Sequence, residues 1–215
     1  MYQDVEFEDD VRGGTLDKEM MIKARRAEMQ FFKKLGVYKK VRKESHMKVI
    51  TTKWVDTNKG DEKDPNYRAR WVGRELALSK RTDLFAATPP LESLRMLLSI
   101  VAGRQSQKHQ KDNFILMTND VKRAYFYAPA TRPIYIKIPE EDREPGDEEN
   151  VGMLRLSLYG TRDAAMNWAK TYTFHLKGLG FIVGSSNPCN FYHPQRDVAC
   201  TVHGDDYTSA GRERI

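Results

Sequence analysis

The sequence predicts an α+β fold, and three observations indicate it. Short runs rich in β-branched residues alternate irregularly with segments of helical period, so the regular strand–helix order of a parallel α/β sheet is absent. Hydrophobic residues make up 40% and charged residues 31% of the 215 positions, which is enough apolar material for a core beneath a large polar surface. No internal repeat is present, so a solenoid or propeller is not expected.

The first third of the chain is expected to hold a tail, a helix and a hairpin. Residues 1–15 read as a frayed acidic tail, and a helix is expected from Leu16 to about Leu35, with Gly36 as its stop. β-branched residues predict a strand over 49–55, followed by a turn-like stretch over 56–66 and a return strand over 67–72. These two strands form a candidate hairpin.

The remaining elements follow from the same patterns. After Pro89-Pro90, a core helix is expected with Leu91, Leu94, Leu97, Leu98 and Val101 on its buried face. A loop over 103–113 is then expected, followed by a buried strand over 114–120 and a strand with Ile134, Ile136 and Ile138 on one face. A solvated acidic loop is expected over 140–150 and a short strand over 154–158. The last elements are a helix over about 162–177, with Ala165, Trp168, Tyr172 and Leu176 towards the core, and a strand–turn–strand unit over 198–210.

Composition excludes several classes of protein. No stretch approaches the roughly 18 apolar residues that span a bilayer, and the acidic N-terminus is typical of neither a signal nor a transit peptide. The two cysteines have no zinc-site spacing with the five histidines. We therefore expect an intracellular protein, cytoplasmic or nuclear, with no membrane partner.

The charge distribution favours a polyanionic partner. The net charge is +6, and a basic run interleaved with aromatic residues lies between Phe31 and Lys48. A solvated, charged face is the alternative interpretation of this run.

Two acidic motifs carry the chemistry. Gly204-Asp205-Asp206 sits at the expected hairpin turn, where glycine supplies the backbone freedom that a tight turn needs. Asp120 ends the expected strand over 114–120. Each motif alone is commonly just a polar turn or a strand cap. Together they would gather carboxylates that repel one another unless cations lie between them, and Mg²⁺ prefers such oxygen ligands and binds substrate phosphates as well. Two such ions form the metal arrangement of nucleotidyl transfer.

The chain resembles the reverse transcriptases of copia-type retrotransposons. Asp120-Val-Lys-Arg-Ala-Tyr-Phe126 and His203-Gly-Asp-Asp206 are similar to the two palm motifs of that family. Further stretches match in the expected order: Glu28–Val41, Lys53–Val55, Tyr67–Val72, Leu94–Leu98, Ile134–Pro139, Leu158–Gly160, Trp168 and Leu179–Phe181. The resemblance covers residues 20–211, which leaves an acidic N-terminal tail over 1–19 and a tail unlike the family over 212–215.

The resemblance implies a reverse-transcriptase fingers region and a partial palm, with an antiparallel palm sheet backed by helices and no thumb. It implies that Asp120, Asp205 and Asp206 are catalytic, and that Asp120, Asp205 and Val121 bind two Mg²⁺ ions, for which Mn²⁺ can substitute. The implied partners are a primed RNA or DNA template, a dNTP, and the rest of the palm, the thumb and the RNase H region of a parent polyprotein.

Other site residues are carried over by the same resemblance. Tyr125 would lie under the incoming sugar and exclude a 2′-hydroxyl, with a buried aromatic as the alternative. Arg70 and Arg68 would reach the triphosphate, for which guanidinium groups are suited, and exposed strand charges are the alternative. His203 and Gly204 would lie near the primer and template.

The sequence departs from the family pattern at three places. His203 stands where the family usually has tyrosine, and Gly204 stands where it has a bulkier residue. Arg162-Asp163-Ala164-Ala165 stands where the family has Lys-Gln-Ala-Pro, whose glutamine lies near the nucleotide. Asp163 would either repel a triphosphate or cap the following helix, and the cap is the favoured interpretation.

Three other functions compete with polymerisation. A nucleic-acid-binding remnant without catalysis would fit the departures and the short chain. A two-metal nuclease or integrase would need a third acid, and Glu213 alone follows Asp206. A purely structural interaction domain would leave the ordered set of motifs unexplained.

Overall fold

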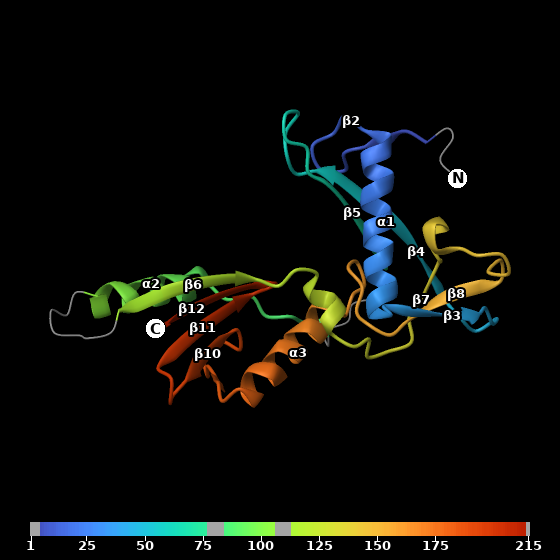
Figure 1. The fold of residues 1–215 in the computed structure, drawn as a ribbon. Coiled ribbons are helices and arrows are strands. Elements are labelled where there is room, and N and C mark those ends of the chain that lie inside the picture. Colours follow the sequence, from blue (N-terminus) through green and yellow to red (C-terminus); the bar gives the residue numbers. More distant parts are fainter. Residues whose placement is uncertain (1–4, 77–83, 106–112, 214–215) are drawn as a thin grey trace. The chain divides into compact units, whose positions relative to one another are not determined.

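The structure is a computed structural model that describes residues 5–76, 84–105 and 113–213 (Figure 1). It divides into two compact units, the first formed by Met1–Lys80 with Ala128–Ala164 and the second by Arg81–Tyr127 with Ala165–Ile215. Helices and several sheets are mixed without regular alternation, so the predicted α+β class is confirmed. Among the described helices, none is long and apolar enough to cross a membrane.

The first unit packs one long helix against a five-stranded sheet. The sheet has the order β3-β8-β7-β4-β5. The elements of this unit are β1 (Phe7–Glu8), β2 (Thr15–Leu16), α1 (Lys18–Leu35), β3 (Tyr38–Arg42), β4 (Val49–Asn58), β5 (Tyr67–Arg74), β7 (Tyr135–Ile136), the 3₁₀ turn η3 (Glu140–Asp142) and β8 (Asn150–Leu154). The predicted hairpin over 49–72 is confirmed as β4–β5, although both strands run further than expected.

Helix α1 has an identifiable signal at each end. The Asp17 side chain accepts a hydrogen bond from the Met20 N–H at the N-terminus, and Gly36 adopts a left-handed φ of 63° at the C-terminus. Gly36 is therefore the stop that the sequence predicts. Met21 faces a small core with Phe7, Leu16 and Ala69, so α1 covers the hairpin β4–β5.

The prediction of a frayed acidic tail is wrong for residues 5–16. Strands β1 and β2 pair, and the turn between them lies along β4. The Asp10 N–H donates to Asp56 O at 2.9 Å, and the Asp9 carboxylate accepts from Asn58 N–H at 2.8 Å and from Thr57 Oγ1 at 3.1 Å. These acids thus satisfy polar groups along β4, a role that acidic composition does not signal. Residues 1–4 lie outside the described part.

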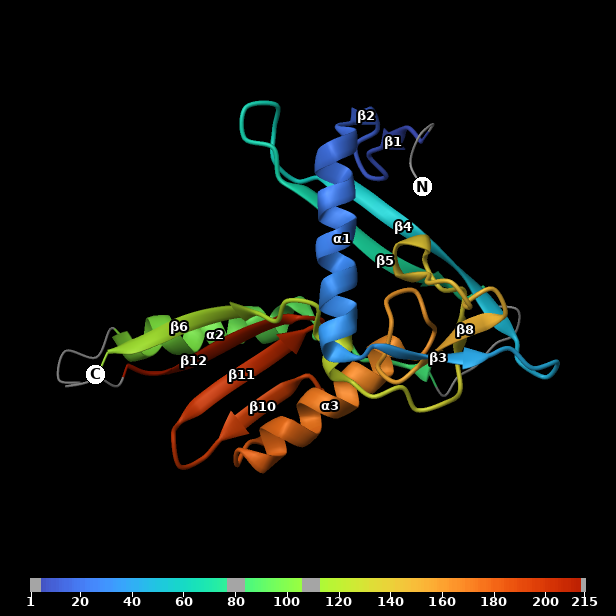
Figure 2. The same ribbon diagram turned by 45° about the vertical axis from the view of Figure 1, so that its right-hand side comes forward.

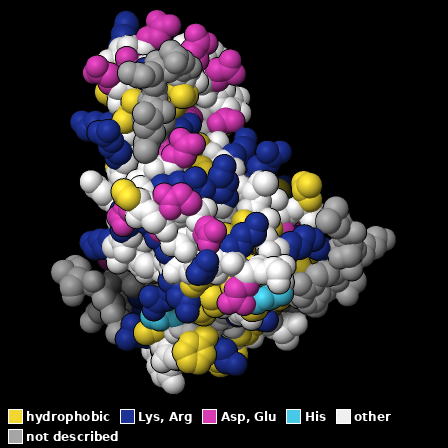
Figure 3. All heavy atoms as spheres, turned by 90° about the vertical axis from the view of Figure 1, so that its right-hand side faces the viewer, with side chains coloured by type: hydrophobic (Ala, Val, Ile, Leu, Met, Phe, Trp, Pro, Cys, Tyr) yellow, Lys and Arg dark blue, Asp and Glu magenta, His cyan; other side chains and the backbone are white. Residues whose placement is uncertain are grey.

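The acidic stretch 140–150 is only partly the solvated loop that was expected. Asp142 and Asp147 are buried, because basic residues of the predicted basic run bind them. Lys33 lies 2.7 Å from Asp142, and Lys40 lies 2.6 Å from Asp147. On the face drawn in Figure 3, basic and acidic side chains accordingly lie beside one another. Part of the basic run therefore neutralises this unit's own acids.

The second unit is a five-stranded antiparallel sheet between two helices. The strand order is β6-β12-β11-β10-β9. The elements are α2 (Leu91–Gln105), β6 (Phe114–Asp120), the 3₁₀ turn η2 (Ala124–Tyr127), α3 (Ala164–Gly178), β9 (Ile182–Val183), β10 (Asn190–His193), β11 (Val198–His203) and β12 (Asp206–Arg212).

The two helices of this unit cover opposite faces of the sheet (Figure 2). Leu97 of α2 packs with Phe114 and Ala210, whereas Tyr172 of α3 stacks edge-on against Phe191 and Tyr207. Tyr207 and Ala210 differ by an odd number of positions on one strand, so their side chains point to opposite faces.

Three predictions for individual elements need correction. On α2 only Leu97 of the predicted face is fully buried, and Leu91, Leu94 and Leu98 are exposed, because Leu97, Ile100 and Val101 are the side chains that pack against the sheet. Strand β6 is at the sheet edge rather than buried, with Phe114 its one buried side chain. The strand expected over 154–158 lies earlier, over β8. The loop prediction over 103–113 and the tail 212–215 fall partly outside the described residues, and Arg212 belongs to β12.

Candidate active site

Strands β6 and β12 bring the two acidic motifs together. The register pairs Asp206 directly with Asp120, and the Val121 N–H donates to Asp205 O at 2.9 Å. Directly paired residues of an antiparallel ladder project on the same face, with Cβ atoms about 4.5–5.5 Å apart. Segments far apart in the sequence thus place two carboxylates side by side at one end of the sheet. Asp206 is therefore the cross-strand neighbour of Asp120.

The turn that carries Asp205 is held at two points. Gly204 has a φ of 64°, in the left-handed region that favours glycine, and this allows the tight link between β11 and β12. The indole Nε1–H of Trp168 on α3 donates to Gly204 O at 2.7 Å. Trp168 is 6% exposed and packs edge-on against Tyr172, so its position is fixed by the core. His203 is exposed at the end of β11 and pairs with Asp206.

Tyr125 lies close enough to the turn to respond to its charge. It sits half-buried in η2, just after Asp120. Burial raises the pKa of the Tyr125 hydroxyl, and the negative charge of Asp205 raises it further. The hydroxyl therefore stays protonated at neutral pH, beside the acids.

Arg68 and Arg70 belong to the first unit. They alternate with buried Ala69 and Trp71 along β5, so both guanidinium groups lie on the face of the hairpin away from α1. The Arg70 guanidinium lies 5.7 Å from the ring centroid of Tyr159, within the range of a cation–π contact. Tyr159 is itself fixed to β5, because Gly73 N–H donates to Tyr159 O at 2.8 Å.

Asp163 is an ion-pair residue of the first unit. It is 1% exposed, and its two carboxylate oxygens each accept a hydrogen bond of 3.0 Å from Arg132. Arg132 also reaches Glu75 at 2.6 Å, and Glu75 accepts the Arg162 N–H at 2.9 Å. Burial favours protonation of Glu75, but the bonds from Arg132 and Arg162 outweigh it and lower the Glu75 pKa. The Asp163 carboxylate thus binds the Arg132 guanidinium. This contact was part of neither expected role, which were to repel a triphosphate or to cap the following helix.

Comparison with known proteins decides the family. A model of the family described as Reverse transcriptase (RNA-dependent DNA polymerase) matches residues 35–204. The chain belongs to the reverse transcriptase family. A protein named Retrovirus-related Pol polyprotein from transposon TNT 1-94, of Nicotiana tabacum, is 26% identical over 206 residues, which cover 92% of this chain and 15% of that polyprotein. The resemblance to copia-type retrotransposon reverse transcriptases is thereby confirmed, and this reverse transcriptase chain spans about 15% of the length of that relative.

Of the three departures from the reverse transcriptase pattern, those at Gly204 and Asp163 have local explanations. At Gly204 an added Cβ would meet nothing within 4 Å, so the turn has room for the family's bulkier residue and only its positive φ favours glycine. The Asp163 carboxylate is compensated by the Arg132 guanidinium, which also pairs with the second acid Glu75. For His203 the structure shows exposure and its strand pairing, and no further contact explains the change.

The donor set of this candidate site fits Mg²⁺. Within residues 5–76, 84–105 and 113–213, no three Asp, Glu, His or Cys side chains form a group that could hold a metal ion. Mg²⁺ does not require such a cage, because it is usually held by one or two carboxylates together with water and substrate phosphates. Two opposed carboxylates on paired strands meet that description, and like charges placed directly opposite each other favour a bound cation.

Sequence reasoning missed several residues that shape the site. Trp168 was expected only to face the core, because a hydrogen bond from an indole to a distant turn leaves no local signal. Arg132 and Glu75 were not singled out either. The acid at Asp163 was the available clue, since a buried carboxylate needs a partner, but the identity of that partner depends on the fold.

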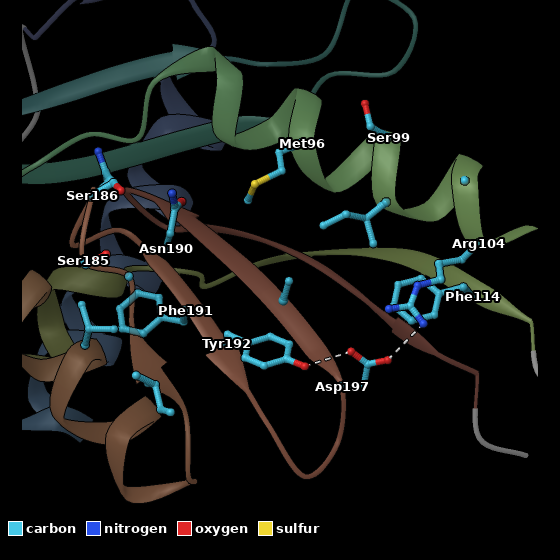
Figure 4. Close-up of a pocket in the computed structure, with 17 residues that line it drawn as sticks. Met96, Ser99, Arg104, Phe114, Ser185, Ser186, Asn190, Phe191, Tyr192 and Asp197 are labelled. Atoms are coloured by element: carbon cyan, nitrogen blue, oxygen red, sulfur yellow. Dashed lines mark hydrogen bonds and ion pairs between the residues drawn. The ribbon is translucent and has the colours of Figure 1, made fainter.

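A pocket in the second unit lies apart from the predicted site residues. It measures about 850 Å³ and lies between α2 and the strands β9 to β11 (Figure 4). At its rim the Tyr192 hydroxyl donates to Asp197 at 3.1 Å, and Arg104 pairs with the same carboxylate at 3.6 Å. No predicted site residue lines it, so volume alone does not mark the candidate active site.

Proposed function

We propose that this chain is the part of a retrotransposon Pol polyprotein that performs RNA-directed DNA synthesis. In this proposal the first unit acts as the fingers and the second as the palm. The observation that carries it is the pairing of β6 with β12, which sets Asp120 against Asp206 and ties Val121 to Asp205. Family membership supports the reaction class, because the family is described as RNA-dependent DNA polymerase and its model matches residues 35–204, a segment that includes Asp120.

In the proposed reaction, the primer 3′-hydroxyl attacks the α-phosphate of a dNTP and pyrophosphate leaves. Asp120 and Asp205, with the main chain at Val121, would hold two Mg²⁺ or Mn²⁺ ions, which when bound activate the attacking hydroxyl and neutralise phosphate charge. Trp168 and Gly204 keep the Asp205 turn in place. Tyr125 would lie against the sugar, Arg70 and Arg68 would bind the triphosphate, and His203 would contact the primer end.

The partners proposed for the chain follow from its relative. A primed RNA or DNA template and a dNTP would be the substrates. Because the chain spans about 15% of the Pol polyprotein from TNT 1-94, regions beyond these residues would supply the thumb and RNase H parts. We therefore expect weak synthesis from this chain alone and stronger synthesis from a longer protein that continues into the downstream sequence.

The test is primer extension on poly(rA)·oligo(dT) with dTTP and Mg²⁺. It compares this chain, the longer protein, and the longer protein carrying Asp205→Asn. We expect incorporation by the longer protein and a loss of at least about 100-fold with Asp205→Asn, since a displaced metal-binding carboxylate costs several kcal/mol of transition-state stabilisation. Asp64→Asn removes the same charge from an exposed loop and should leave the rate unchanged.

A second measurement does not depend on turnover. Asp120 and Asp206 repel each other, so a cation held by Asp120 and Asp205 should also offset this repulsion and stabilise the folded state. We expect millimolar Mg²⁺ to raise the Tm of the unaltered chain and to have a smaller effect on Asp206→Asn. If the longer protein is silent in primer extension but still binds the duplex in a salt-sensitive way, the polymerase proposal fails and a nucleic-acid-binding remnant is the better account.

A further inference from the structure

A basic pocket lies on the face of the β4–β5 hairpin that points away from α1. It has a volume of about 350 Å³, near the lower end of the range for small-ligand sites. Its cationic lining residues are Arg12, Lys59, Arg68 and Arg70. The polar floor includes Thr57 and Asn58 of β4. The strand register explains part of this lining. Arg68 pairs with Thr57 and Arg70 pairs with Val55, so the side chains of these two pairs lie on one face of the hairpin.

Arg12 reaches the pocket because the N-terminal turn is attached to the hairpin. The Arg12 N–H donates to Asp9 Oδ1 at 2.8 Å, and Arg12 Nη1 donates to Gly60 O at 2.7 Å. The guanidinium is therefore anchored through one nitrogen and retains further N–H donors, since the group carries five. Arg12 lies outside the segment that the family model matches, so this contribution belongs to the chain's own N-terminal turn.

No acidic side chain is among the described residues that line this pocket. Asp9 of the same turn is buried, and it accepts hydrogen bonds from main-chain N–H groups, that of Arg12 among them, and from the Thr57 hydroxyl. The N–H groups of Arg12 and Asn58 lower the pKa of Asp9 to about 2, against the opposing effect of burial. Asp9 thus shapes the turn and stays ionised, while four cationic groups face the pocket.

We propose that this pocket binds phosphoryl groups, and that Arg12 and Lys59 extend the phosphate-binding surface of Arg68 and Arg70. Guanidinium forks match the geometry of phosphate oxygens, and several cations around one small hollow favour a polyanion over a single carboxylate. The phosphates come either from a nucleoside triphosphate or from the backbone of a nucleic-acid strand. The choice of these two sources rests on the proposed function, whereas phosphate binding itself does not.

The experiment measures binding without synthesis. The unaltered chain, Arg12→Gln, Lys59→Gln and the control Arg26→Gln are titrated with fluorescein-labelled single-stranded dT15 at several salt concentrations, and separately with inorganic tripolyphosphate. Arg26 is exposed on α1 and lies outside the pocket, so its substitution removes one equal charge from another face. We expect Arg12→Gln and Lys59→Gln each to weaken binding about three- to tenfold and to reduce the log–log salt slope for dT15 by about 1.

Each outcome decides something. Weakening for both probes supports a general phosphate site, weakening for dT15 alone assigns it to a strand, and weakening for tripolyphosphate alone assigns it to a nucleotide. Arg12→Lys should recover part of the affinity, because it keeps the charge and loses the fork. If Arg12→Gln and Lys59→Gln behave like Arg26→Gln with both probes, the proposal is overturned. Failure of primer extension leaves these binding results unaffected, so the two proposals fail separately.

Discussion

At the scale of single residues, a close approach of two glycines fixes the Leu158–Gly160 segment to β5. Gly160 has a φ of 82°, and a Cβ at this position would lie 2.0 Å from Gly73 O. The Gly73 N–H donates to Tyr159 O, so the same contact positions the tyrosine that lies near Arg70. The segment Leu158–Gly160 and strand β5, which both carry stretches similar to the family, are therefore held together by direct contacts.

Gly160→Ala should destabilise the chain by about 2–4 kcal/mol, because it combines an unfavourable positive φ with overpacking against the main chain. Urea unfolding would measure this loss. Gly146→Ala is the matched control, since Gly146 has a φ of 96° and open space around an added Cβ. It should cost only about 1 kcal/mol. Equal losses for the two variants would show that the Gly73 contact does not matter.

Trp168→Phe should remove one hydrogen bond from the Asp205 turn while keeping an aromatic ring in the core. We expect a loss of about 1 kcal/mol in stability and a several-fold lower kcat in primer extension by the longer protein, with KM for dTTP little changed. The control is Trp71→Phe, because the buried Trp71 indole N–H has no hydrogen-bond partner among the described residues. A Trp168→Phe protein with an unaltered kcat would show that the bond does not position the turn.

At the scale of elements, short acidic segments hold the first unit together. The turn after β1 bonds to β4 through Asp9 and Asp10, and the 140–150 stretch bonds to α1 and β3 through Asp142 and Asp147. Composition indicated exposed acids in both places. The prediction failed because the local sequence does not distinguish an acid whose carboxylate binds buried N–H groups or an ammonium group from an acid that faces solvent.

The stability of the first unit should fall as the pH drops from about 4 towards 2. The pKa of Asp9 is lowered from 3.8 to about 2, and that of Asp147 is lowered to about 2 by Lys40 and Asn150. A depressed pKa in the folded state means that the stabilisation is present above about pH 4 and is lost as the pH falls towards 2. Urea midpoints of the unaltered chain and Asp9→Asn should therefore differ at pH 6 and converge near pH 2. The control Asp64→Asn should show no such convergence, and a constant difference for Asp9→Asn would contradict the role of its charge.

At the scale of the whole molecule, net charge is a poor guide to where nucleic acid binds. The net charge of +6 does not show which cations are already paired within the chain. Lys33, Lys40 and Arg42 of the basic run pair with acids of residues 142–149. Among the described residues, the lining of the pocket at Arg12, Lys59, Arg68 and Arg70 includes no acid. The net charge therefore does not distinguish the cations that pair with acids of residues 142–149 from those that line the pocket.

Lys40→Gln should lower stability without a special effect on nucleic-acid affinity. Lys40 Nζ donates to Asp142 O at 2.5 Å and to Asp147 Oδ2 at 2.6 Å, so its loss should cost about 1–3 kcal/mol. Lys39→Gln removes the same charge from the exposed side of β3 and should leave stability nearly unchanged. Anisotropy with labelled dT15 should give affinities within about twofold for the two variants. A much weaker affinity for Lys40→Gln would show that this lysine contacts nucleic acid.

The sequence by itself determined the fold class, the C-terminal end of α1 at Gly36, the hairpin β4–β5 and the turn between β11 and β12. These features depend on local signals, namely side-chain period, caps and glycine turns, which act over a few residues. The resemblance to the family was also recognisable, because the two acidic motifs occur in order with the other matching stretches, although each motif is weak alone.

Only the tertiary structure decided which residues meet. The pairing of Asp206 with Asp120, the bond from Trp168 to Gly204, the binding of Asp163 by Arg132 and the placement of Arg12 beside Arg68 all join segments distant in the chain. The exposed leucines of α2 and the edge position of β6 likewise depend on which neighbour covers each surface. Such contacts are set by the register and packing of non-local elements, for which one sequence carries no local signal.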